Sequence, residues 1–275
     1  MAEAAKEQES ASERGLLLLL LPAQTLQGKV AIVSGSSRGL GADMALDLAK
    51  RGAKVVIIYA SPSSTPKADT LVQTIKDLPN ESSAIAVRAD LSQPSAPAEV
   101  VKQTLSKFGP HIHILVNNAA VQITRALADI TQTDYERVYN VNVRGTILLT
   151  QAVLPHLAPR ARVVNISSVG ARAGFAALSL YTSSKAALEG LTRSWAAELG
   201  KTGTTVNCVA PGPVQSEMLD SIPTHIVQMQ MDNTPLENRV GTPQEVSNVV
   251  SWLAGDESAW VTGQVLNVSG GWTMY

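Results

Sequence analysis

The feature that most constrains the fold of this chain is a regular alternation of short apolar runs with helical segments, which begins at Lys29. Each apolar run is rich in β-branched residues, which is typical of a buried strand. Strands that alternate with helices pair in parallel, because each crossover helix returns the chain to the same edge of the sheet. We therefore expect an α/β fold with a parallel sheet and helices on both faces.

The same patterns predict where the elements lie. Strands are expected at Lys29–Ser34, Lys54–Tyr59, Ser83–Arg88, Ile112–Asn117, Arg162–Ile166, Thr205–Ala210 and Gly263–Val268. Helices are expected at Ala42–Arg51, Ala68–Leu78 and Ala96–Phe108, in two stretches that end at His156, and from the Tyr181 region to about Gly200. A loop is expected at Ser61–Lys67. No linker or repeat is visible after residue 28, which favours a single domain over residues 28–275.

The first 27 residues differ in composition from the rest and are expected to form a mobile N-terminal extension. Leu16 to Leu21 are consecutive leucines closed by Pro22, whereas a membrane-spanning helix needs about twenty apolar residues. The glutamates before this run argue against a mitochondrial presequence, which is poor in acids. We expect the leucines to pack on the domain or on a partner subunit, and we expect no contact with a membrane.

Charge and cysteine content exclude several classes of function. The net charge is −1, with 22 basic and 23 acidic residues, so nothing favours nucleic acid or an anionic membrane as a partner. The single cysteine, Cys208, cannot form an intrachain disulfide or a multi-cysteine metal site, and its apolar setting predicts a small core side chain. The four histidines show no metal-ligand spacing, so we predict no metal. These features fit a reducing, cytoplasmic location.

A glycine-rich turn joins the first strand to the first helix, in the run Ser34-Gly35-Ser36-Ser37-Arg38-Gly39-Leu40-Gly41. Glycines at such a turn allow the backbone to approach a pyrophosphate closely, and the helix N-terminus supplies free N–H groups and a positive dipole. An ordinary turn between a strand and a helix needs fewer glycines. The position between a strand and a helix therefore favours a dinucleotide-binding site.

The end of the second strand indicates which dinucleotide is bound. An NAD site usually places an acid there to hold the ribose 2′-OH, but this chain has Tyr59-Ala60-Ser61. Arg38 lies in the glycine-rich turn, and Ser63 and Ser64 follow the strand. A cation with hydroxyl groups suits a 2′-phosphate, so we predict NADP(H) as the cofactor.

Tyr181 and Lys185 lie four residues apart, and Ser168 lies upstream of them. On a helix this spacing puts the phenol and the ammonium on one face. A neighbouring cation favours phenolate, so we expect a lowered tyrosine pKa and a side chain that can exchange a proton at working pH. The pair alone also occurs on ordinary solvated helix faces, so the rest of the chain has to support the catalytic interpretation.

Further motifs follow in a fixed order. They are Asp90-Leu91, Asn117-Asn118-Ala119-Ala120, Asn142-Val143-Arg144-Gly145, Asn165-Ile166-Ser167-Ser168, Tyr181 with Lys185, and Pro211-Gly212-Pro213-Val214. With the glycine-rich turn they resemble the short-chain dehydrogenase/reductase family over residues 28–272. The resemblance implies a Rossmann-like, doubly wound fold with a seven-stranded parallel sheet. The chain is similar to fungal polyketide and hydroxynaphthalene reductases near Tyr59-Ala60-Ser61 and over residues 235–241. It also resembles 3-oxoacyl-carrier-protein reductases, but Ala197 lies where these typically carry an arginine that docks the carrier, which argues against a carrier-bound fatty acyl substrate.

The resemblance implies a catalytic tetrad of Asn142, Ser168, Tyr181 and Lys185. Tyr181 would protonate a carbonyl oxygen as hydride arrives from the nicotinamide, and Ser168 would hydrogen-bond the same oxygen. Lys185 would lower the Tyr181 pKa and bind the nicotinamide ribose. Asn142 would hold a water that links Lys185 to solvent.

The resemblance also implies where the cofactor binds. The expected cofactor contacts are Gly35, Ser37, Arg38, Gly39, Leu40, Gly41, Tyr59, Ala60, Ser61, Asp90, Leu91, Asn117, Ala119, Tyr181, Lys185, Pro211, Gly212, Val214 and Ser216. A substrate lid is expected at about residues 214–240, with Met218, Ile222, Ile226, Val227, Met229 and Met231 as its apolar side chains. A homotetramer or homodimer is expected.

Two functions remain open at this point. The first is an NADP(H)-dependent oxidoreductase that reduces a ketone to a secondary alcohol, or the reverse, on a small-molecule substrate. The second is a non-catalytic NADP(H)-binding protein that senses redox state or scaffolds a complex. The intact tetrad argues against the second, because a binding module has no need of it.

Overall fold

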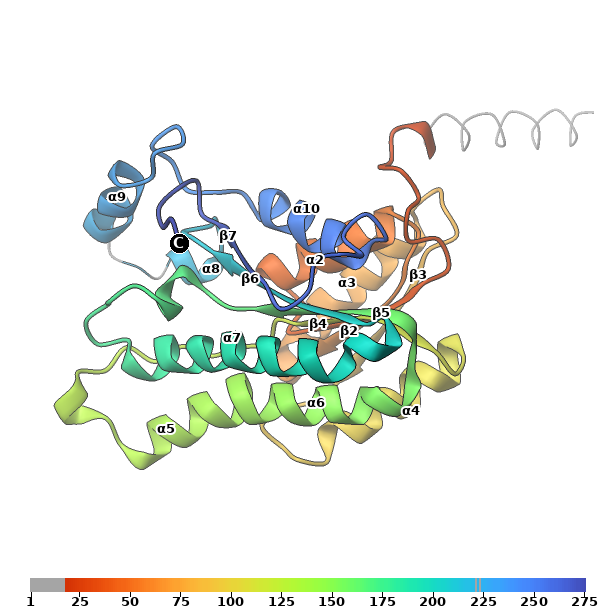
Figure 1. The fold of residues 1–275 in the computed structure, drawn as a ribbon, viewed down its shortest axis with the longest axis horizontal. Coiled ribbons are helices and arrows are strands. Elements are labelled where there is room, and N and C mark those ends of the chain that lie inside the picture. The colour runs from red at the N-terminus through yellow and green to blue at the C-terminus, as the bar shows by residue number, and fades with distance from the viewer. Residues whose placement is uncertain (1–17, 221, 223) are drawn as a thin grey trace, which may run out of the picture.

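The computed structural model describes residues 18–220, 222 and 224–275 and contains the expected seven-stranded sheet (Figure 1). All strand pairs are parallel, and the spatial order is β3-β2-β1-β4-β5-β6-β7. The strands are β1 (Val30–Ser34), β2 (Lys54–Tyr59), β3 (Ser83–Arg88), β4 (Ile112–Asn117), β5 (Leu157–Ile166), β6 (Thr205–Pro211) and β7 (Val265–Val268). The predicted fold class is confirmed.

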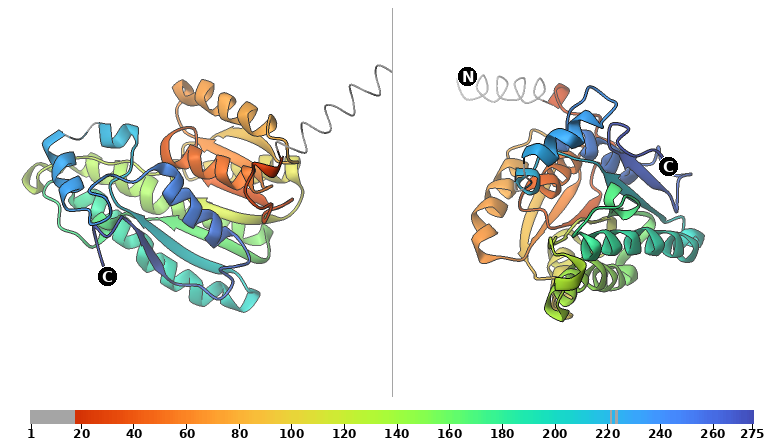
Figure 2. Two further views of the ribbon diagram at one scale, coloured as in Figure 1. Left: turned by 90° about the horizontal axis from the view of Figure 1, so that it is seen from above. Right: turned by 90° about the vertical axis from the view of Figure 1, so that its left-hand side faces the viewer.

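Helices cover both faces of the sheet (Figures 1 and 2). On one face lie α2, α3 and α10, and on the other lie α4, α6 and α7. The helices are α2 (Gly39–Lys50), α3 (Thr65–Lys76), α4 (Ala96–Phe108), α5 (Gln132–Tyr139), α6 (Thr146–Val153), α7 (Ser179–Leu199), α8 (Glu217–Asp220), α9 (Thr224–Asp232) and α10 (Pro243–Ala254).

Two hydrophobic cores result, one on each face of the sheet. Successive side chains of a strand point to opposite faces, so Ala31 and Val33 of β1 join the core under α2 and α10, while Ile32 joins the core under α4 and α6. All three side chains are fully buried. The near-continuous apolar strands of the sequence are explained by this burial from both sides.

The order of strands reverses beside β1, which pairs with β2 on one side and with β4 on the other. In open parallel sheets, ligands bind at the carboxyl ends of the two strands beside which the strand order reverses, because the helices that follow them lie on opposite faces. The glycine-rich turn after β1 and the run after Asn117 in β4 meet there. The topology therefore puts the predicted cofactor residues at one edge of the sheet.

Several boundaries differ from the sequence expectations. Helix α2 begins at Gly39 and not at Ala42, and α3 begins at Thr65, inside the expected loop. Pro66 sits in the first turn of α3, where its missing N–H costs nothing. Strand β5 begins at Leu157 and not at Arg162, with an irregular register against β4.

Helix α10 has no counterpart in the sequence prediction. Its start carries a capping box, in which Thr242 and Glu245 satisfy each other's backbone N–H groups, and Pro243 occupies its first turn. This signal stands in the sequence and was sufficient to predict the helix. The helix packs along α2, where Ser247 donates to Asp43 over 2.6 Å and Ser251 donates to Asp47 over 2.5 Å.

The segment before β1 behaves differently at its two ends. Leu18, Leu19 and Leu20 are exposed, by 40%, 82% and 79%, so these leucines do not pack on the domain as one expectation had it; Leu16 and Leu17 lie outside the described residues. Core packing nevertheless reaches back to Leu26, which is fully buried and bonds the carbonyl of Arg51 through its N–H. Among the described residues, no helix has the length and apolar character needed to cross a membrane.

Candidate active site

The glycine-rich turn is held tightly against the loop that follows β4. Gly35 has φ +64°, and a Cβ there would lie 2.8 Å from the Cα of Ala119. A Cβ on Gly41 would lie 2.3 Å from the carbonyl oxygen of Gly35. Only glycine fits either position without moving the backbone. Outside Gly39 the space is open, so the N-terminus of α2 is accessible to a ligand.

Ser34 and Asn118 fix this contact. The Ser34 hydroxyl accepts hydrogen bonds from the N–H groups of Asn118 and Ala119, both over 3.0 Å. The Asn118 side chain donates to the carbonyls of Ser34 and Gly35 over 2.9 and 3.0 Å. Because these bonds are already made within the protein, the turn is preorganised for a dinucleotide.

The expected adenosine end of the cofactor site lies after β2. Tyr59 is buried, and its hydroxyl accepts a hydrogen bond from Thr65 over 3.1 Å. Ala60 and Ser61 are exposed, and the Ser61 and Ser63 hydroxyls lie 2.7 Å apart. A contact from Tyr59 to a cofactor would therefore come from its backbone, whereas Ser61 offers its side chain.

Arg38 is paired with a residue that sequence reasoning missed. Its guanidinium forms an ion pair with Glu217, in α8 of the predicted lid. The Lys67 ammonium, from the first turn of α3, lies 2.6 Å from the same carboxylate. Hydrogen bonds from Lys67 and Arg38 lower the pKa of Glu217. The sequence did carry a signal for Lys67, namely a cationic side chain in the first turn of the helix that follows β2.

Asp90 and Leu91 follow β3 and have different surroundings. The Asp90 carboxylate is exposed and accepts from the N–H of Ser92 over 2.9 Å. The Leu91 side chain is buried, and a Cβ on Gly145 would lie 2.7 Å from the Leu91 carbonyl oxygen. Asp90 can thus reach a ligand with its side chain, while Leu91 can do so only with its backbone.

Asn117 lies in a buried polar network between two strands. Its amide nitrogen donates to Asn165 of β5 over 2.9 Å and to Thr150 of α6 over 3.1 Å. Asn165 in turn donates to Thr192 of α7 over 2.8 Å. The Asn117 amide nitrogen is therefore committed to this network, whereas its buried side-chain oxygen has no hydrogen-bond partner among the described residues.

Tyr181 stands in the first turn of α7, close to Ser168 at the end of β5. Burial raises the pKa of the Tyr181 phenol, and a hydrogen bond with Ser168 acts in the opposite direction. The expectation of a lowered pKa is therefore wrong for this structure, because removal of the phenolate from water outweighs the stabilising contacts. A raised pKa keeps the phenol protonated, which suits a proton donor.

Lys185 is 2% exposed, and its ammonium donates to the carbonyl of Ile166 over 2.6 Å. The same ammonium lies 5.7 Å from the centroid of the Tyr181 ring. Burial lowers the pKa of Lys185 to about 8, and Cys208 nearby acts to raise it. The predicted pairing of Lys185 with Tyr181 on one helix face is present, but the pKa that is lowered is that of the lysine and not that of the tyrosine.

Asn142 lies in a turn of π-helix, Asn140–Gly145, between α5 and α6. It is fully buried, and its side chain makes two hydrogen bonds with the backbone of Val121, over 2.8 and 2.9 Å. It also donates to the Ser184 hydroxyl over 3.0 Å. Such bulges are frequent at functional sites because they turn a side chain out of the helical register.

The predicted lid follows β6 and contains α8 and α9. Pro211 and Val214 are buried, and the backbone of Pro213 and Gln215 pairs with Gly241. Ser216 caps α8 by accepting from the N–H of Leu219 over 3.2 Å. No side chain of α9 is fully buried, and Met229 is 47% exposed, so the lid has few core contacts. The Met218 side chain lies outside what the structure describes.

The segment Val169–Phe175, which we expect to help select the substrate together with Gln122, His225 and the lid, is anchored by three residues that the sequence analysis did not name: Glu189, Trp272 and Tyr275. Arg172 donates to Glu189 of α7 over 2.7 Å and lies 4.3 Å from the ring centroid of Tyr275 at the C-terminus. Phe175 stacks on Trp272 with centroids 5.4 Å apart. Residues from the end of the chain therefore border the predicted site, although they are remote from it in sequence.

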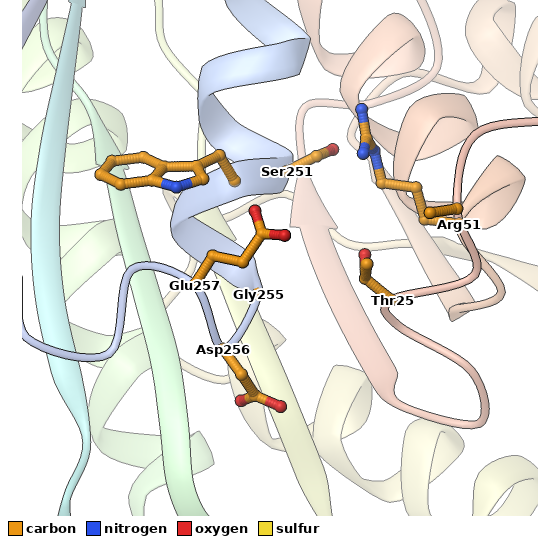
Figure 3. A pocket seen from close by; sticks show the side chains of 8 residues that line it. Thr25, Arg51, Ser251, Gly255, Asp256 and Glu257 are labelled. Carbon is orange, nitrogen blue, oxygen red and sulfur yellow. The ribbon is translucent and has the colours of Figure 1, made fainter.

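A cavity of about 360 Å³ lies at the opposite edge of the sheet (Figure 3). It is lined by Ala23, Thr25, Arg51, Ser251, Trp252, Gly255, Asp256 and Glu257. These residues precede β1, follow α2, or belong to the last turns of α10 and the loop after it, at the edge where strands begin. The cavity is therefore separate from the tyrosine and the glycine-rich turn. Among the described residues, no cluster of His, Cys, Asp or Glu could hold a metal ion.

The fold and the site together define the class of Rossmann-like oxidoreductases. Comparison with protein-family models agrees, since the model described as Enoyl-(Acyl carrier protein) reductase matches residues 35–273. The short-chain dehydrogenase/reductase FrzI of Cladobotryum sp is 42% identical over 91% of this chain and 98% of its own length. The chain therefore belongs to the short-chain dehydrogenase/reductase family.

Two further relatives are informative. The hydroxynaphthalene reductase-like protein Arp2 of Metarhizium robertsii is 37% identical over 90% of this chain and 96% of its own length. Among solved structures, a blue fluorescent protein from a metagenomic library, in complex with NADPH, is 37% identical with a TM-score of 0.85. The match covers 91% of this chain and 100% of the chain of the relative. The predicted family is confirmed.

Proposed function

We propose that this protein reduces a ketone to a secondary alcohol, or catalyses the reverse reaction, with NADP(H) as the hydride carrier. The observation that carries the proposal is the convergence of Ser168, Tyr181 and Lys185 at the edge of the sheet that also bears the glycine-rich turn. A bound nicotinamide supplies the hydride chemistry. The protein has to bind the substrate, orient it and deliver a proton.

Each of the four side chains has a proposed task. The Tyr181 phenol, kept protonated by burial, donates its proton to the carbonyl oxygen. The Ser168 hydroxyl donates a hydrogen bond to the same oxygen and orients it. The Lys185 ammonium stabilises the phenolate that remains. Asn142 contacts Ser184 on the helix that carries the pair, which supports its role in a path that returns a proton to Tyr181.

The preference for NADP(H) is supported by the donor groups at the adenosine end. Arg38 and Lys67 supply two cations, and Ser61 supplies a hydroxyl, beside an edge of β2 that carries no acid. The NADPH complex of the metagenomic relative is consistent with this choice. The positions of Gly35 and Gly41, where a Cβ would collide with backbone, fit a turn that a pyrophosphate approaches.

The decisive experiment follows NADPH oxidation at about 340 nm with a panel of ketones that includes hydroxynaphthalene-type compounds. Wild type is expected to consume NADPH, and Tyr181→Phe to lose on the order of a hundredfold or more in rate while it still binds NADPH. Equal rates in the two proteins would contradict the acid role of Tyr181. NADPH binding without turnover on any ketone would favour the sensor or scaffold alternative.

A further inference from the structure

Three charged side chains from separate parts of the chain meet at the adenosine end of the predicted cofactor site. Arg38 comes from the glycine-rich turn, Lys67 from the first turn of α3, and Glu217 from α8 of the lid. The Glu217 carboxylate bridges the two cations with one oxygen on each. All three side chains are half-exposed, so a ligand can reach them.

The position of this cluster in the fold indicates that it can bind a ligand and is more than a surface ion pair. The carboxyl end of β2 is where a dinucleotide's adenosine ribose lies in this class of fold. Lys67 follows that end closely, and Arg38 stands at the N-terminus of α2, where N–H groups and the helix dipole already favour an anion. Arg38 and Lys67 together form an anion-binding site there. In this structure the site is occupied by the Glu217 carboxylate of the protein itself.

We propose that Glu217 is an internal competitor for the 2′-phosphate of NADP(H), and that Lys67 is, with Arg38, a second determinant of cofactor choice. This inference rests on the proposed use of NADP(H). The Glu217 carboxylate stands in for the phosphate between the two cations. Binding of the cofactor then displaces Glu217 and releases the contact that holds α8 of the lid.

Replacement of the carboxylate by the phosphate is favourable because the phosphate carries more negative charge and more acceptor oxygens. A phosphate monoester carries a charge of about −1.5 to −2 and three acceptor oxygens, whereas a carboxylate carries one charge and two oxygens. Exposed ion pairs of the Glu217 kind are individually weak. A 2′-phosphate therefore displaces the carboxylate, and a cofactor without that phosphate does not.

The experiment uses adenosine 2′,5′-bisphosphate and 5′-AMP as probes, because they differ only in the 2′-phosphate. Titration calorimetry measures each dissociation constant for wild type, Glu217→Gln, Lys67→Met and the double variant. Glu257→Gln is the matched control, since Glu257 is an exposed glutamate at the opposite edge of the sheet.

Removal of the competing carboxylate is expected to tighten bisphosphate binding by roughly threefold to tenfold and to leave 5′-AMP unchanged. Lys67→Met is expected to weaken bisphosphate binding in wild type and more strongly in the Glu217→Gln background, where the lysine is free. Glu257→Gln should match wild type. Hydrogen exchange of the α8 amides should become faster with the bisphosphate and not with 5′-AMP.

Two negative results are distinguishable. If wild type prefers the bisphosphate but Glu217→Gln binds it no more tightly, the competition is refuted and the proposed use of NADP(H) stands. If neither wild type nor Glu217→Gln binds the bisphosphate better than 5′-AMP, the proposed cofactor choice itself is refuted. Unchanged binding in Lys67→Met would exclude Lys67 as a determinant.

Discussion

At the scale of single residues, Lys185 most directly limits the proposed chemistry. Its ammonium is almost fully buried, and burial lowers its pKa to about 8. A sequence pattern places the lysine beside the tyrosine but carries no information about its exposure to water. The protonation state of Lys185 therefore depends on its burial in the folded chain.

We expect the rate of ketone reduction to fall as the pH rises through about 8. Above this pH Lys185 loses its proton, and the cation that stabilises the Tyr181 phenolate disappears. The measurement is kcat for NADPH-dependent reduction between pH 6 and about 9.5, with the folded state checked by circular dichroism at each pH. A rate that stays constant across this range would contradict the role of Lys185.

Cys208 illustrates the opposite case, in which sequence and structure agree. It is fully buried in β6, and burial raises the pKa of its thiol to about 12. A thiol of this kind is inert, because the thiolate is the reactive form. The interpretation of Cys208 as a small core side chain is confirmed.

At the scale of elements, α10 depends on a local signal at its start. The Thr242 hydroxyl accepts from the N–H of Glu245, and the Glu245 carboxylate accepts from the N–H of Thr242 over 2.8 Å. Arg239 binds the same carboxylate over 2.7 and 2.9 Å. The helix start is thus held by one carboxylate shared between a backbone N–H and a guanidinium.

We expect Thr242→Ala to lower the free energy of unfolding by about 1 kcal/mol, because the first turn of α10 loses a side-chain acceptor. Chemical denaturation monitored by circular dichroism measures the change. Thr242→Ser keeps the hydroxyl and is the control, with a smaller effect. Equal stability of the alanine variant and wild type would show that the cap contributes nothing.

The π-helical turn Asn140–Gly145 is a second element whose role emerges only from its contacts. The extra residue in the turn directs Asn142 to the backbone of Val121 and to Ser184. A regular helix would turn the same side chain to a different face. The sequence motif Asn142–Gly145 indicates where the functional residue lies, and the π-helical turn determines where the Asn142 side chain points.

At the scale of the whole molecule, one half-buried histidine links stability to pH. His113 in β4 accepts a hydrogen bond from the N–H of Val30 over 3.1 Å through its Nδ1. Burial lowers its pKa, and the neighbouring charges of Lys29 and His111 lower it further. In the folded state the His113 side chain therefore stays neutral at pH values somewhat below 6.5, its ordinary pKa, at which a free histidine would take up a proton.

We expect the free energy of unfolding to decrease as the pH falls below about 6.5. Because the folded pKa is below the unfolded one, the unfolded chain binds the proton more readily, and protonation favours unfolding. Urea denaturation at pH 7.5 and at about pH 5.5 measures the effect in wild type and in His113→Asn. A variant with the same pH dependence as wild type would exclude His113 as the cause.

The local sequence determined the class of fold and the identity of the central site residues. The apolar runs predicted all seven strands, because burial from both sides needs a continuous apolar pattern. The glycines of Gly35–Gly41 and the spacing of Tyr181 and Lys185 are local requirements of a turn and of a helix face. Sequence alone therefore reached the family and the residues that we propose for catalysis.

Only the tertiary structure decided the contacts between segments that are far apart in the chain. Glu217 joins Arg38 and Lys67, and Tyr275 covers Arg172, because the fold brings together residues separated by long stretches of sequence. Desolvation is a property of all neighbours at once. For this reason the direction of the Tyr181 pKa shift and the lowered pKa of Lys185 could not be read from their spacing.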